Sequence, residues 1–224
     1  GHATPSLGIV SPANKLWFNQ GLQSTPYDPT GALEVLKQEG FHKDGDALRD
    51  KAGHAVSFSL ITNAGNKPRE RMGSLLQQDL QQIGITVNFV PLDFPSIIER
   101  VTRTFDYDAV LLGFTNVDLD PNGQMNVWVS SADLHEWNPA QKTPETTWEA
   151  EIDKQMRVQA STLDRKQRKL AFERVQEIAA EENPTLHLVD KNALVAISRK
   201  VNNADPVVLT PQTYWNIEHL SLSK

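Results

Sequence analysis

The sequence predicts an α/β fold with a mainly parallel sheet flanked by helices. Three apolar segments of strand length, at 55–62, 85–92 and 107–114, alternate with two segments of helical spacing, at 69–84 and 94–104. Parallel strands need a long crossover, usually a helix, and such crossovers are right-handed. The order strand, helix, strand, helix, strand therefore predicts a parallel βαβαβ unit.

The chain before this unit predicts an extended segment followed by one short helix. Residues 1–27 carry scattered Pro, Gly and Ser, which favour extended backbone and turns. A helix is predicted within 27–41, with Asp28 as its N-cap, Pro29 at its first position and Gly40 as its stop.

The residues at the ends of the predicted helices and strands support the βαβαβ prediction. In the helix predicted over 69–84, apolar side chains recur at helical spacing and Gly84 closes the segment. Pro95 stands near the start of the second helix. The segment 107–114 is apolar enough for a strand that is buried on both faces.

The C-terminal half predicts two longer helices and a less regular tail. The helix over 145–163 repeats large apolar residues every four positions, and the helix over 164–183 begins at Asp164 as its cap. A short strand is expected within 185–190, and the aromatic tail 211–222 is expected to be extended.

Composition excludes several classes of protein. The formal net charge is -6 and Lys and Arg do not cluster, so nucleic acid is not an expected partner. The sequence has no Cys, which excludes thiolate zinc sites and disulfides. No segment approaches the roughly 18 to 20 apolar residues of a spanning helix, and the first residues lack the regions of a signal peptide.

No motif indicates a metal, a cofactor or a nucleophilic enzyme. The six His are far apart in the sequence, and none pairs with another at helical spacing. The turn 63–68 has neither the spacing of a phosphate-binding loop nor the dinucleotide fingerprint, and there is no G-x-S-x-G elbow. We therefore expect no cofactor and no acyl-transfer chemistry.

The stretch "GFTNVDLDPNG", residues 113–123, follows the third predicted strand. Ligands of open parallel sheets bind at the carboxyl ends of the strands, which places Asp118 and Asp120 near a binding edge. Alternatively, Asp120 and Pro121 begin an ordinary turn. The residues alone also leave open a small-molecule enzyme with Asp118 or Asp120 as its base.

Other candidate ligand contacts are aromatic or amide side chains. Large aromatic residues in a weakly periodic segment often line a cleft, and Phe114 and Trp128 are of this kind, although core packing is an equal alternative for Trp128. Trp148 lies on a helical face and is expected in the core. Asn63 and Asn66 lie in a turn that brings backbone amides to a helix N-terminus, where a polar ligand group could dock.

Several segments follow one another in an order that covers nearly the whole chain: "GHATPSLGIVSPAN", "YDPTGALEVLKQEGF", "VSFSLITNAGNKPRERMGSLLQQDLQQIGITVNF", "DYDAVLLGF" with "DLDP", and "NPTLHLVDKNALVAISRKVNN". Their order and spacing resemble the family 5 extracellular solute-binding proteins. These are the dipeptide-, oligopeptide- and nickel-type binding components of ABC importers.

The resemblance implies a type II periplasmic-binding-protein-like lobe of a non-enzymatic protein, which is periplasmic or extracellular and associated with the cell surface. In such proteins two lobes close on a solute and then dock on a membrane permease. This chain resembles the second lobe. We expect 1–224 to form a single domain of a longer exported protein, with 1–27 leading in from the missing N-terminal lobe and 205–224 returning to it.

The expected partners are therefore a small polar solute, such as a peptide, and the ABC transporter permease subunits. In peptide-binding members, the third residue after an aromatic at the position of Phe114 is an Asp that pairs with the peptide's α-amino group. Here that residue is Val117, which leaves a sugar, an opine or another polar solute as alternatives to a peptide. The residues expected at the cleft are Phe114, Asn116, Asp118, Asn63, Asn66 and Trp128.

Overall fold

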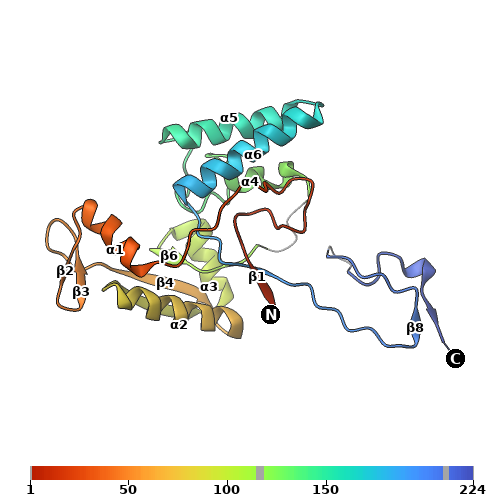
Figure 1. Cartoon of the computed structure of the whole chain (residues 1–224), viewed down its shortest axis with the longest axis horizontal. Coiled ribbons are helices and arrows are strands. Elements are labelled where there is room, and N and C mark those ends of the chain that lie inside the picture. Colours follow the sequence, from red (N-terminus) through yellow and green to blue (C-terminus); the bar gives the residue numbers. More distant parts are fainter. Residues whose placement is uncertain (1, 115–118, 209–211, 224) are drawn as a thin grey trace. The chain divides into compact units, whose positions relative to one another are not determined.

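The computed structural model describes residues 2–114, 119–208 and 212–223 (Figure 1). Its backbone contacts group into two compact units: unit 1 consists of Gly1–Ser24 with Thr115–Lys224, and unit 2 consists of Thr25–Phe114. Each unit has its own secondary structure and its own buried core. That the whole chain acts as a single domain stays a prediction.

Unit 2 is built on a parallel sheet, as the sequence predicts. The central strand β4 (Ser57–Asn63) pairs in parallel with β5 (Thr86–Leu92) on one side and with β6 (Ala109–Val110) on the other. The crossover from β4 to β5 is α2 (Lys67–Gln82), and the crossover from β5 to β6 contains α3 (Phe94–Glu99). The predicted βαβαβ unit is therefore confirmed.

Helices cover both faces of this sheet. Successive residues of a strand point to opposite faces. On one face Ile61 of β4 packs with Ile97 of α3. On the other face Leu60 is paired with Phe89 of β5, whose ring lies against Gly73 of α2. Figure 1 accordingly shows β4 between α2 and α3.

The third strand is shorter than predicted, and side chains hold it on β4. Its two residues are half-buried, so the prediction of a strand buried on both faces over 107–114 is wrong in extent. Just before the strand, the Asp108 carboxylate accepts hydrogen bonds from the Ser59 amide at 2.8 Å and the Ser59 hydroxyl at 2.7 Å. Just after it, the Thr62 hydroxyl donates to the Leu111 carbonyl at 2.7 Å. The Leu111 carbonyl, which lies just after the last ladder pair, therefore accepts its hydrogen bond from the Thr62 side chain.

The helix predicted over 94–104 is α-helical only in its first part. After α3 the chain continues as a π-helix, Arg100–Thr104, and Phe105 ends it with a left-handed φ of 54°. The preceding α1 (Pro29–Gln38) matches its prediction closely, because the Asp28 carboxylate accepts from the Gly31 amide at 2.9 Å. A hairpin of β2 (His42–Asp44) and β3 (Ala47–Arg49) completes unit 2.

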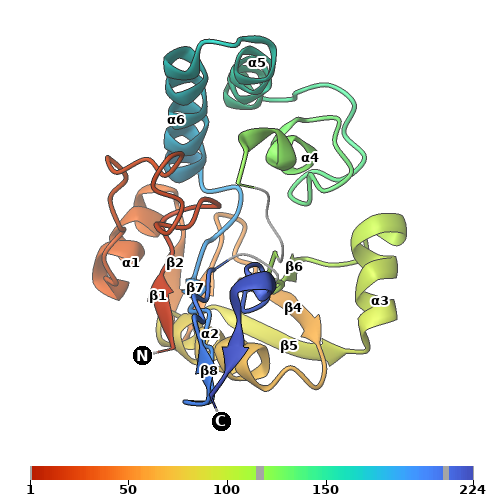
Figure 2. The same ribbon diagram turned by 90° about the vertical axis from the view of Figure 1, so that its right-hand side faces the viewer.

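Unit 1 contains the longer helices. A short 3₁₀-helix, Pro121–Gln124, leads into α4 (Met125–Trp128). The predicted pair of long helices is confirmed as α5 (Thr147–Ser161) and α6 (Arg165–Glu182), which pack against each other (Figure 2). In the described ranges, no helix is both long enough and apolar enough to cross a bilayer.

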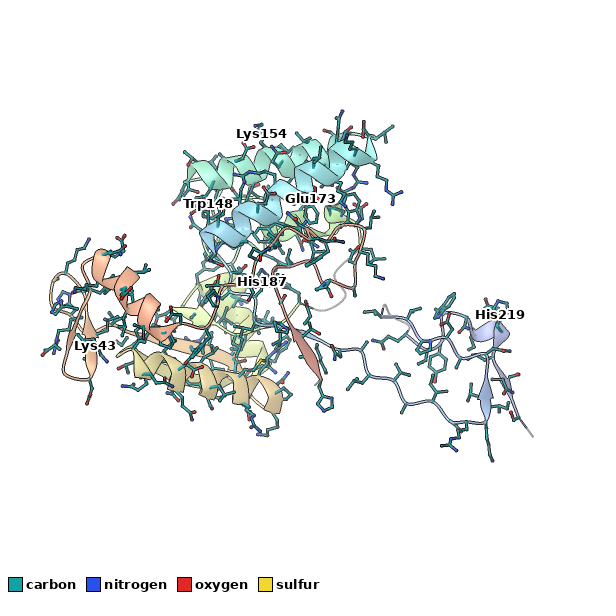
Figure 3. The ribbon with its side chains drawn as sticks, in the orientation of Figure 1. Lys43, Trp148, Lys154, Glu173, His187 and His219 are labelled. Carbon is teal, nitrogen blue, oxygen red and sulfur yellow. The ribbon has the colours of Figure 1, made fainter. Side chains whose placement is uncertain are left out.

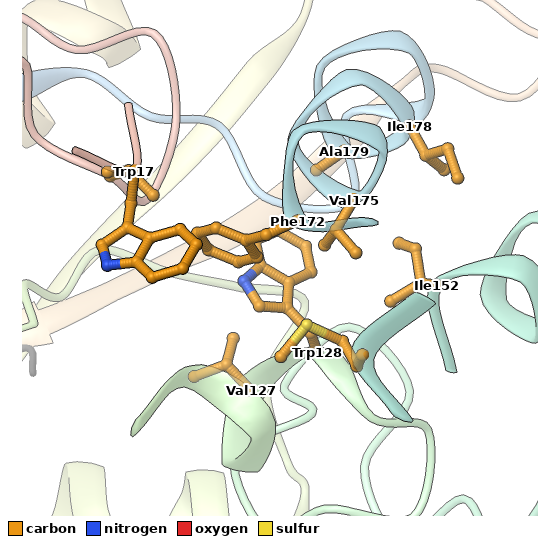
Figure 4. Close-up of a cluster of buried hydrophobic side chains, with 10 residues drawn as sticks. Trp17, Val127, Trp128, Ile152, Phe172, Val175, Ile178 and Ala179 are labelled. Carbon is orange, nitrogen blue, oxygen red and sulfur yellow. The ribbon is translucent and has the colours of Figure 1, made fainter. Parts of the chain in front are cut away.

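The core of unit 1 joins these helices to the N-terminal segment (Figure 4). Ile152 of α5 and Phe172 of α6 are fully buried, and Trp128 of α4 is 1% exposed. The Trp17 indole meets the Phe172 ring edge-on, with ring centroids 6.3 Å apart. The N-terminal segment is therefore fixed by a buried aromatic residue, although its backbone is mostly turns and extended chain.

Short antiparallel pairs make up the rest of unit 1. The strand β1 (Ala3–Pro5) pairs with β7 (Val189–Lys191), which overlaps the strand predicted within 185–190. Near the C-terminus, β8 (Val201–Asn202) pairs with β9 (Ser221–Leu222). The tail is therefore less extended than predicted, since the 3₁₀-helix Ile217–His219 precedes β9.

Substituting Gly73 by Ala should destabilise the chain. A methyl group built at Gly73 overlaps the Phe89 ring. Overpacking of this kind costs about 1–3 kcal/mol, which exceeds the gain of about 0.5–1 kcal/mol from replacing a helical Gly. Urea denaturation should therefore give a lower free energy of unfolding. The exposed Gln78→Ala change on the same helix is the control, and equal or greater stability of Gly73→Ala would contradict the packing described here.

Candidate functional site

The carboxyl edge of the parallel sheet in unit 2 brings several of the predicted residues together. Asn63 is the last residue of β4, and Phe114 follows β6, the neighbouring strand. Phe114 is 47% exposed. This edge is where open parallel sheets bind ligands, because loops and helix N-termini converge there. We call Asn63, Arg69, Gly113 and Phe114 the edge group.

Both predicted asparagines interact with one arginine. The Asn63 side-chain oxygen accepts a hydrogen bond from the Arg69 guanidinium. Asn66 is the N-cap of α2, and its side-chain oxygen accepts from the Arg69 backbone amide at 3.2 Å. Asn66 therefore caps the start of α2. This helix begins at Lys67, two residues earlier than the predicted 69–84.

Arg69 is a residue that the sequence reasoning missed. It lies in the first turn of α2, is half-buried, and reaches across to the end of β6. A Cβ placed on Gly113 would lie 2.9 Å from its Nη2 atom, so the guanidinium lies directly over this glycine. The signal in the sequence was an Arg three positions after an N-cap Asn, in the turn that leaves a buried strand.

The remaining predicted site residues are Asn116, Asp118 and Trp128. Asn116 and Asp118 lie outside the described residues, and their roles stay predictions. Trp128 belongs to the hydrophobic core of unit 1, where its indole nitrogen donates to the Gln124 side chain at 3.4 Å. Of the two alternatives for Trp128 the structure shows core packing, because this residue completes the layer between α4 and the long helices.

Asp120 begins a turn and forms an ion pair. Its carboxylate accepts from the Asn122 amide at 3.0 Å and from the Arg168 guanidinium at 2.8 Å. Arg168 also donates to the Gln159 carbonyl at 2.9 Å and lies 5.1 Å from the centre of the Trp17 ring. The hydrogen bond from Arg168 lowers the pKa of Asp120. A carboxylate with a lowered pKa is a weak base, so Asp120 is poorly suited to proton abstraction.

The aromatic loop before α5 is organised by one buried carboxylate, Glu149. Its side chain is 3% exposed and accepts from Trp137 at 3.2 Å, from Gln141 at 3.1 Å, and from both the amide and the hydroxyl of Thr146 at 3.0 Å. Thr146 and Glu149 form a capping box at the start of α5. The spacing T-x-x-E signals this motif in the sequence.

Other aromatic side chains pack against the Trp137 ring that donates to this carboxylate. Trp137 packs between Trp128 and Trp148, with ring centroids 5.6 and 6.4 Å away, and His135 lies 3.8 Å from it. Burial would raise the pKa of Glu149, but the hydrogen bonds from Gln141, Thr146 and Trp137 outweigh it and hold the pKa at about 2. The loop is therefore a packed structural element around an anion.

Figure 3 draws the described side chains, with His187 and His219 among those labelled. Within this part of the chain, no group of three or more His, Asp or Glu side chains could hold a metal ion together. Burial lowers the pKa of His187, which favours the neutral form of its imidazole.

The fold is that of a type II periplasmic-binding-protein lobe. The solved structure of the oligopeptide-binding protein AppA from Bacillus subtilis, in complex with a nonapeptide, matches all of this chain with a TM-score of 0.78 and 25% identity. The match covers 43% of the AppA chain. The predicted fold class is therefore confirmed.

Residues 1–136 match the family model of bacterial extracellular solute-binding proteins, family 5 Middle, and the chain belongs to this family. The curated AppA of Bacillus subtilis is 29% identical over 175 residues, which are 76% of this chain and 31% of AppA. The glutathione-binding protein GsiB of Salmonella paratyphi A is 24% identical over 203 residues, which are 90% of this chain and 37% of GsiB. The chain thus spans about a third of the length of these binding proteins.

The buried anion predicts how stability depends on pH. The pKa of Glu149 is about 2 in the folded chain, against 4.5 for an ordinary glutamate. Its stabilising effect is therefore complete above about pH 4.5 and is lost as the pH falls towards 2. Glu149→Gln should lower the free energy of unfolding at pH 7 by roughly 3 kcal/mol and should flatten its decline between pH 5 and 3.

Urea denaturation at a series of pH values measures both effects. The control is Glu151→Gln, because Glu151 is on the same helix and pairs with Lys154 at the surface, where such pairs contribute about 0–1 kcal/mol. An acid-induced decline that is equally steep in wild type and Glu149→Gln would show that Glu149 is not its source.

Proposed function

We propose that this chain is the second lobe of the substrate-binding component of an ABC importer. It captures a peptide or another small polar solute in a cleft against a first lobe encoded elsewhere in a longer protein. The closed protein then delivers the solute to the membrane permease in the periplasm or at the cell surface. Membership of the solute-binding family and the relatives' roles as binding proteins support this proposal.

The observation that carries the proposal is the edge group of unit 2. It presents an exposed aromatic ring, an amide and a guanidinium at the carboxyl ends of two adjacent parallel strands. Such a surface supplies apolar contact and hydrogen-bond donors without a reactive nucleophile. Asn63 and Phe114 would contact the solute, together with Asn116 and Asp118, which come soon after Phe114 in the sequence.

A peptide is the solute class best supported by the relatives, because AppA is named for oligopeptides and GsiB for glutathione. Val117 stands where peptide-binding members have the amine-binding Asp, so Asp118 would have to take that role. An enzymatic role has less support, since the Asp120 carboxylate pairs with Arg168 and accepts from the Asn122 amide in a turn.

The C-terminal segment supports a return of the chain to the missing lobe. Large apolar side chains are exposed along it, at Val208, Tyr214, Ile217 and Leu222, each between 62% and 77%. Contiguous exposed apolar residues commonly mark surfaces that another part of a protein covers. We propose that 205–224 packs on the first lobe and that 1–27 leads in from it.

The two-lobe mechanism predicts that affinity depends on the whole protein. Isothermal titration with trialanine, and native mass spectrometry for a solute retained during purification, should detect binding to the full-length protein. The isolated 224-residue chain should bind at least about 100-fold more weakly, because half of the enclosing surface is missing. Equal affinities would contradict a shared cleft.

Tyr214→Ser tests the return segment. In the full-length protein it should lower the free energy of unfolding by about 1–3 kcal/mol, since an apolar contact with the first lobe is lost. In the isolated chain, where Tyr214 is exposed, the change should stay within about 0.5 kcal/mol. Leu163→Ser is the control, because Leu163 lies in the α5–α6 connection and is fully exposed. Equal losses in both proteins would argue against the docked tail.

A further inference from the structure

Arg69 differs from the other arginines in how its charge is compensated. Among the described residues, Arg49, Arg100, Arg103, Arg157, Arg168 and Arg174 form ion pairs with carboxylates. The arginines without such a pair in this part of the chain are Arg69, Arg71, Arg165 and Arg199, and all except Arg69 are exposed to solvent. Arg69 thus combines partial burial with a neutral partner.

Among the described residues, the Arg69 guanidinium makes one side-chain hydrogen bond. One nitrogen, Nη1, donates to the neutral amide oxygen of Asn63. A guanidinium has five N–H donors in a planar fork, and this fork matches two oxygens of a carboxylate. Partial burial of a cation is unfavourable unless an anion compensates it, so the position favours an incoming negative charge.

Gly113 provides the space for the guanidinium at the strand end. Its backbone φ is not in the left-handed region, so no conformational demand requires a glycine there. A side chain at this position would instead force the flexible end of Arg69 to shift, since the added Cβ would lie 2.9 Å from Nη2. The absence of a side chain therefore lets the cation lie across the ends of β4 and β6.

We propose that Arg69 is a specificity-determining residue that binds a carboxylate group of the solute. Asn63 orients the guanidinium, and Gly113 leaves room for it beside the exposed Phe114 ring. This inference rests on the proposed function and adds a requirement to it: the solute carries at least one carboxylate. An uncharged sugar would leave the cation uncompensated when the cleft closes.

The test compares two probes on the full-length protein by isothermal titration. Trialanine and trialanine amide have nearly the same size and differ by one carboxylate. Wild type should bind trialanine about 10- to 100-fold more tightly than the amide, because a charge-assisted bond to a partly buried cation is lost. Arg69→Gln should reduce the affinity for trialanine by a similar factor and change the affinity for the amide less than about threefold.

Two further variants separate a binding role from a structural one. Gly113→Ala keeps the charge of Arg69 but displaces its guanidinium, so it should weaken trialanine binding and spare the amide. Arg71→Gln removes the same charge from an exposed position on the same helix and should leave both affinities within about threefold. Thermal denaturation of each variant confirms that it is folded.

The outcomes distinguish this inference from the proposed function. Binding of both probes with equal affinity by wild type overturns the role of Arg69 alone, and it is the result expected if an acid of this chain, such as Asp118, neutralises the guanidinium. An equal loss for both probes in Arg69→Gln also overturns it. If wild type binds neither probe and releases no solute on denaturation, the proposed function fails and the inference fails with it.

Discussion

The ladder of β6 on β4 covers only Ala109 and Val110, so its register also depends on contacts beyond it, among them the Leu111 amide, which donates to the Ile61 carbonyl at 2.8 Å. The Asp108 carboxylate fixes one end through Ser59, and the Thr62 hydroxyl fixes the other through Leu111. A shift by one residue would turn every following side chain to the opposite face. The position of Phe114 therefore depends in part on polar contacts outside the ladder.

The edge group gains its chemistry from this register. Parallel pairing places Asn63 and Gly113 at the same edge, and the cap of α2 by Asn66 sets the first turn from which Arg69 extends. The position of the Arg69 guanidinium thus depends on strand pairing, on the helix cap and on the absence of a side chain at Gly113. In unit 1 the buried Glu149 carboxylate stabilises local structure instead: it accepts hydrogen bonds from the aromatic loop before α5.

Local patterns were sufficient to predict most elements of the fold. Helical spacing and capping residues identified α1, α5 and α6, and Asp28 and Asp164 cap their helices as expected. Tertiary contacts decided the rest. The π-helical end of the second crossover has no periodicity of its own, and Trp128 could be assigned to the core only once its neighbours were known. Arg69 was missed because its role depends on Gly113, more than forty positions away.

Arg168 connects segments that are distant in the sequence. It contacts Trp17 in the N-terminal segment, Asp120 before α4, and Gln159 in α5, all through one planar cation. Lysine has neither the fork nor the flat face for these contacts, so it is not a conservative replacement here. Because the three partners share a single group, the energetic effects of substituting them will not be additive. Sequence variation at any one of them therefore has to be interpreted together with the other two.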